Sequence, residues 1–174
     1  MRLMILTVLL AAVTVIARGQ KLDLTLPEGL AAKASEKTEI NLDPDTVAAG
    51  KGMIASALPK DMAAKLAGMK EVHILSYEFD KTGQYSASDI EPIRKQVAKG
   101  SGWSPIVNVK EKDETTEIYV YKQGDKVAGI LLISAEAKEF SIIHVIGEMS
   151  MASLQELVKS TVAYDLGTAK PAVH

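Results

Sequence analysis

The sequence predicts an α+β fold, a two-layer sandwich in which helices pack on one face of a mainly antiparallel sheet. Three observations support this class. Most helical patterns precede the C-terminal strands, four strand patterns follow one another toward the C-terminus, and very short turns separate those four. Turns this short join antiparallel neighbours, so we expect a C-terminal four-strand meander.

The first half of the chain combines helical and strand patterns. Pro27 and Pro59 predict helix starts, since proline fits the first helical turn, and Pro44 ends a strand pattern. In order, we expect an alternating apolar segment over residues 21–26, a helix from Pro27 to about Lys37, a strand over 38–43, a helix capped by Asp43 or Asp45, and a helix from Pro59.

The middle of the chain has the clearest pattern. In Glu71 to Asp80, apolar and polar residues alternate as in a half-buried strand. Ser86 and Asp89 then form a variant of the capping box, which predicts a helix that ends at Gly100 or Gly102. After it we expect strands over residues 105–112, 115–122, 126–134 and 138–147, and a helix over 151–160.

Residues 1–19 have the pattern of a secretory signal peptide: a positive start, a short apolar run and small residues before a polar stretch. The apolar run is shorter than the 17–25 residues that span a bilayer, so we expect cleavage after Gly19 or Ala17. The rest then divides into a single domain over 20–164 and a flexible tail over 165–174. We therefore expect an exported protein, periplasmic or extracellular, without a stable membrane anchor after cleavage.

The composition limits the classes of partner that the protein can bind. The chain has 20 basic and 22 acidic residues and a formal net charge of −2, with no dense basic stripe, which argues against nucleic acid. It has no cysteine, which excludes disulfides, thiol catalysis and cysteine-based metal sites. The remaining partner classes are a protein of the cell envelope and a small ligand.

No motif identifies a cofactor or a catalytic residue. Gly50 to Ala55 matches a loose dinucleotide pattern, but no strand leads directly into its glycines, so we expect these glycines inside a helix and no cofactor. His73 and His144 alternate with apolar neighbours and are weak candidates for a metal site if their strands are adjacent. The more common interpretation of each is a partly buried imidazole with a hydrogen-bond partner.

Three aromatic residues are the candidate ligand-binding residues. Alternation places Tyr119 and Tyr121 on one strand face with Glu117, opposite Ile118 and Val120. Two interpretations stay open: the tyrosines pack under a helix, or they form a platform for stacking or protein contact. Trp103 is expected at a junction of helix and strand and joins them as a candidate.

Four blocks of residues together resemble a bacterial family of small exported proteins, domain of unknown function 4252. The blocks are Ala31 to Glu36; Tyr77 to Ser86 with Asp89 to Arg94; Gly102 to Val107; and Ile133 to Glu139 with Val145 to Gly147. The resemblance implies no activity, cofactor or catalytic residue. Some relatives look like lipoproteins, which require a cysteine for attachment of the lipid. This chain has no cysteine and does not match that feature. The resemblance also implies a link to signalling, because relatives are encoded near envelope sigma-factor systems.

The sequence thus favours an exported, non-catalytic domain that binds a protein or small ligand through the exposed face of its sheet. One alternative is a periplasmic enzyme that uses His73 and His144. Another is a component of envelope stress signalling.

Overall fold

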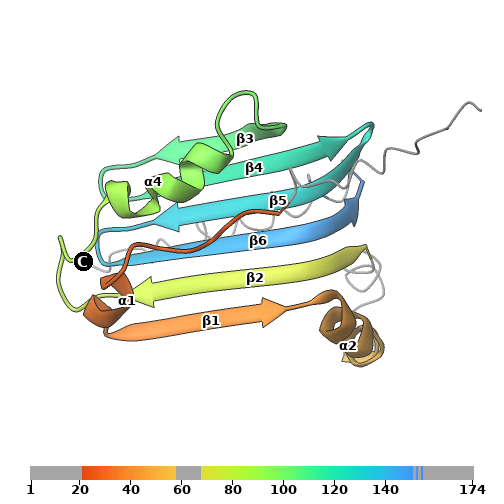
Figure 1. Ribbon diagram of the computed structural model, residues 1–174, viewed down its shortest axis with the longest axis horizontal. Coiled ribbons are helices and arrows are strands. Elements are labelled where there is room, and N and C mark those ends of the chain that lie inside the picture. The colour runs from red at the N-terminus through yellow and green to blue at the C-terminus, as the bar shows by residue number, and fades with distance from the viewer. Residues whose placement is uncertain (1–20, 58–67, 151, 153, 155–174) are drawn as a thin grey trace, which may run out of the picture.

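The computed structural model describes residues 21–57, 68–150, 152 and 154. Its described part centres on a six-stranded sheet in the order β1-β2-β6-β5-β4-β3, in which all neighbours are antiparallel (Figure 1). The predicted α+β class, with an antiparallel sheet, is therefore confirmed. The strands are β1 (Glu36–Leu42), β2 (Met69–Glu78), β3 (Trp103–Lys110), β4 (Thr115–Gln123), β5 (Lys126–Ala135) and β6 (Glu139–Met149).

The helices begin where the sequence provides caps. Helix α2 (Pro44–Ala57) starts after Asp43, whose carboxylate accepts the Thr46 amide at 2.7 Å. Helix α4 (Ala87–Gln96) starts at the predicted capping box, in which the Ser86 amide donates to Asp89 at 2.8 Å. Gly50 lies inside α2, as expected, so the glycine pattern there is not a phosphate-binding turn.

One face of the sheet is covered by α4, by the short α1 (Leu30–Lys33) and by the extended segment of residues 21–27, which crosses in front of the sheet (Figure 1). We call it the helix-covered face. The three leucines of the alternating segment pack against its core. The fully buried core residues of this face include Phe79, Ile90, Ile93, Leu131, Ile133, Phe140 and Ile142.

The opposite face carries a smaller core. Ile118 and Val120 alternate with the tyrosines of β4, as the sequence predicts, and pack here beside Val127 of β5. Leu154, beyond the end of β6, is 1% exposed and joins this cluster. Both faces of the sheet therefore bury apolar side chains.

The helix predicted from Pro27 to Lys37 is wrong in length. Gly29 adopts a left-handed conformation with φ of 81°, and α1 spans only Leu30–Lys33 before Ala34 turns extended. The Ser35 amide then donates to the Glu78 carbonyl at 2.8 Å, and β1 starts at Glu36 instead of residue 38. Pairing with β2 thus overrides the local helical tendency of this alanine-rich stretch.

Several predictions fall on other parts of the chain. The leader over 1–19, the helix from Pro59, most of the helix over 151–160 and the tail over 165–174 lie outside the described residues.

Candidate functional site

Trp103 is the first residue of β3 and is 4% exposed, at the junction after α4 that the sequence predicts. Two glycines make room for the rings of Trp103 and Tyr121. A Cβ on Gly129 of β5 would lie 3.0 Å from the indole ring, and Gly102, with φ of 89°, would bring a Cβ to 2.7 Å from the Tyr121 ring. The Trp103 and Tyr121 rings meet edge-on with centroids 5.7 Å apart. The indole therefore packs against Tyr121 of β4 and Gly129 of β5.

Tyr119, two residues along β4, is oriented by a buried ion pair. Its hydroxyl donates to Glu117 at 2.6 Å, and Arg94 of α4 reaches the other carboxylate oxygen through two nitrogens, at 2.8 and 2.9 Å. Burial, and then the adjoining Glu117, raise the pKa of Tyr119 to about 12. The phenol therefore remains a protonated donor at neutral pH, and its ring is fixed in place.

These two aromatic residues line a cavity of about 630 Å³ between the end of α4 and β3, which we call the tryptophan pocket. Val97 and Pro105 add apolar wall, while Ala98 and Lys99 lie at its exposed margin. The three candidate aromatic residues predicted from the sequence thus lie close together. Trp103 and Tyr119 line the pocket, and Tyr121 packs against Trp103.

The tyrosines lie on the helix-covered face, where both pack partly buried against the core. They therefore do not form a platform on an exposed face of the sheet. Of the two interpretations left open by the sequence, the structure favours packing under the helix side, with Tyr119 also reaching a cavity. A role in ligand binding stays a prediction.

The two histidines face each other directly across β2 and β6. Their rings stack with centroids 5.8 Å apart, His144 is 0% exposed, and His73 Nε2 lies 3.4 Å from a Glu71 carboxylate oxygen. Among the residues that the structure describes, no group of three or more histidine, cysteine or acidic side chains is arranged to hold a metal ion. A metal site here would therefore have to draw on a third ligand from elsewhere.

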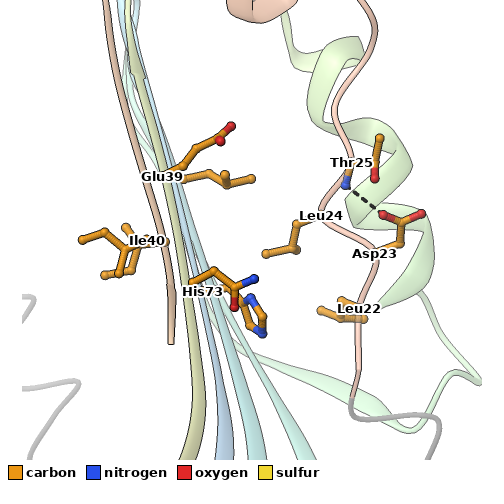
Figure 2. A pocket seen from close by; sticks show the side chains of 10 residues that line it. Leu22, Asp23, Leu24, Thr25, Glu39, Ile40 and His73 are labelled. Carbon is orange, nitrogen blue, oxygen red and sulfur yellow. Dashed lines mark hydrogen bonds between the residues drawn. The ribbon is translucent and has the colours of Figure 1, made fainter. Parts of the chain in front are cut away.

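A second cavity, of about 460 Å³, lies between the extended segment and the β1–β2 edge of the sheet; we call it the arm cleft. Figure 2 shows Leu24 and Glu39 pointing into it from opposite sides, with His73 at its base and Ile40 pointing away behind the sheet. Asp23 turns back to accept the Thr25 amide at 2.9 Å. No sequence pattern predicts this cleft, since it depends on where the segment crosses the sheet.

The described residues thus define an α+β domain with one open sheet and two cavities on its helix-covered face. The chain belongs to the DUF4252 family, a domain of unknown function, whose model matches residues 32–157. The resemblance seen in the sequence is confirmed. No curated protein and no solved structure matches the chain. In the part that the structure describes, no helix is both long and apolar enough to cross a membrane.

Proposed function

We propose that this chain is an exported, non-catalytic domain that binds a small apolar or aromatic molecule in the tryptophan pocket. The observation that carries the proposal is the pocket itself, a cavity of about 630 Å³ bounded by Trp103, Tyr119 and Pro105. Ligand pockets are typically apolar clefts of about 300–1,000 Å³ with a few fixed polar groups. Both the volume and the lining match this description.

The chemistry of the lining selects the ligand class. The faces and edges of Trp103 and Tyr119 favour a flat apolar group, which gains by offset or edge contact. Arg94 and Glu117 neutralise each other behind Tyr119, so that pair offers no net charge to a ligand. Lys99 at the exposed margin supplies a cation. The proposed ligand is therefore an aromatic or apolar molecule with an acidic group at its outer end.

We predict that anilinonaphthalene sulfonate, an aromatic probe with one acidic group, binds the folded protein saturably at one site. Trp103 is the single tryptophan of the chain, so energy transfer from it to the probe reports binding to this domain, and the variant below assigns that binding to the tryptophan pocket. Ala98→Phe, at the exposed margin, fills part of the cavity and is expected to weaken binding about tenfold, or about 1.4 kcal/mol.

The matched control is Ala137→Phe, at an exposed turn position between β5 and β6. It adds the same side chain away from the tryptophan pocket and is expected to leave binding unchanged. Equal binding by wild type and Ala98→Phe would remove the support for this site.

Export is the second part of the proposal, and it is supported by the pattern of residues 1–19. We expect the protein in the periplasmic fraction of its native cells, with a mature N-terminus at Gln20 or Arg18. Cell fractionation followed by N-terminal sequencing checks this. An intact precursor in the cytosolic fraction would contradict it.

One observation favours a second candidate, a periplasmic enzyme that uses the histidine pair. His73 stacks on His144 and also lines the arm cleft, so an imidazole is accessible there to a bound molecule. A panel of hydrolase substrates with purified wild type and His73→Ala separates the two candidates. Activity that His73→Ala abolishes would favour the enzyme.

A further inference from the structure

The two edges of the sheet differ in how well they can accept another strand. Strand β3 carries Pro105 and an irregular register between Pro105 and Val107, features that disfavour pairing at an edge. Strand β1 runs at the other edge with seven residues in unbroken register with β2 and without proline or glycine (Figure 1). Edge strands of this kind present unpaired amides and carbonyls, so β1 is the edge suited to accept a strand.

The described residues also leave most side chains of β1 exposed. Glu36 to Asn41 are all exposed, and Ile40, at 40%, is one of the large apolar side chains that the described residues leave exposed. By its register, Ile40 shares the face of Ile74, opposite the helix-covered face. A strand added at this edge would bring a neighbour directly against Ile40.

We propose that β1 pairs antiparallel with β1 of a second copy of this chain, about a twofold axis at Ile40. This register places Ile40 opposite Ile40, Thr38 opposite Leu42, and Glu39 opposite Asn41. It also brings Lys37, which pairs with Glu39 of its own strand at 2.9 Å, toward Asp43, the residue after β1 that caps α2, and the symmetry makes this approach of opposite charges twice. The two sheets then join into one continuous sheet across the dimer.

Neighbouring registers fit less well. A shift of the axis to Glu39 sets two identical carboxylates opposite each other, which is destabilising. A shift to Thr38 preserves a Lys37–Glu39 pair but sets Ile40 against Glu36, a charged side chain. Charge pairing and apolar contact therefore both favour a twofold axis at Ile40 and a second copy of this chain as the partner. The dimer also brings the two arm clefts to either side of the axis, since Glu39 and Asn41 line them.

The test uses the absence of cysteine from the chain. Opposed residues in an antiparallel pair have Cβ atoms about 4.5–5.5 Å apart, near the span of a disulfide. Ile40→Cys is therefore expected to form a covalent dimer under mild oxidation, more efficiently than Glu39→Cys or Thr38→Cys. Val109→Cys is the matched control, since Val109 is 44% exposed on the other edge, and it is expected to remain monomeric.

Sedimentation equilibrium of the wild type tests the pairing without cysteine, at about 100 µM protein because edge contacts of small area are weak. Ile40→Lys sets two like charges opposite each other and is expected to weaken the dimer about tenfold, while Val109→Lys leaves it unchanged. A wild type that stays monomeric at this concentration, or an Ile40→Cys protein no better cross-linked than Val109→Cys, overturns the proposal. Protection of the β1 amides by a foreign envelope protein bound to a monomeric chain would also overturn it.

Discussion

Phe140→Ala is expected to lower the free energy of unfolding by about 3–5 kcal/mol, because it leaves a cavity at the centre of the helix-covered face. Phe140 is 1% exposed, and its ring lies 5.3 Å from that of Tyr77 and 5.1 Å from that of Tyr85, between centroids. Globular domains typically have a total stability of about 5–15 kcal/mol, so this is a large share. Urea unfolding followed by Trp103 fluorescence measures the change.

Two further variants make the result interpretable. Phe140→Leu keeps most of the volume and is expected to cost clearly less, so it remains measurable if the alanine variant does not fold. Ile106→Ala, at a side chain 40% exposed on β3, is expected to change the stability by less than about 1 kcal/mol. Equal losses for Phe140→Ala and Ile106→Ala would mean that the aromatic cluster is not the core.

Arg94→Leu is expected to lower the free energy of unfolding by about 3 kcal/mol, because it leaves the Glu117 carboxylate buried without its cation. The Glu117 side chain is 8% exposed, and Arg94 supplies two nitrogens to one of its oxygens at 2.8 and 2.9 Å. Among the groups described around this carboxylate, the Tyr119 hydroxyl would then be the one remaining hydrogen-bond donor. Chemical unfolding of the purified variant gives the value.

Lys95→Leu is the matched control, since Lys95 is the next residue of α4 and is exposed. It is expected to change stability by less than about 0.5 kcal/mol. Arg94→Leu combined with Glu117→Leu removes both charges and is expected to recover much of the loss. If the double variant is as unstable as the sum of its parts, the cost comes from lost packing and not from the orphaned charge.

Local signals predict the parts of this fold that depend on near neighbours. The capping box at Ser86 specifies the start of α4, and alternation in β4 correctly separates Tyr119 and Tyr121 from Ile118 and Val120. Short turns indicate antiparallel pairing, which supports the α+β class. The sequence also predicts Trp103 at the junction after α4, although α4 ends at Gln96 and not at the predicted Gly100 or Gly102.

The missed features depend on contacts between distant residues. The order that puts β2 between β1 and β6 decides that His73 faces His144, and nothing local specifies that order. The tryptophan pocket needs the end of α4 beside β3, and the Arg94–Glu117 pair joins a helix to a strand 23 residues away. The helix predicted from Pro27 to Lys37 failed for the same reason, because pairing with β2 overrides local preference there.

Displacement of a bound probe tests whether the tryptophan pocket holds a natural small molecule. Anilinonaphthalene sulfonate is bound to the wild-type protein, an organic extract of the native periplasmic fraction is added, and energy transfer from Trp103 is recorded. We expect a component of the extract to displace the probe, and Ala98→Phe to retain that component about tenfold less well. An extract that leaves the probe in place would contradict it.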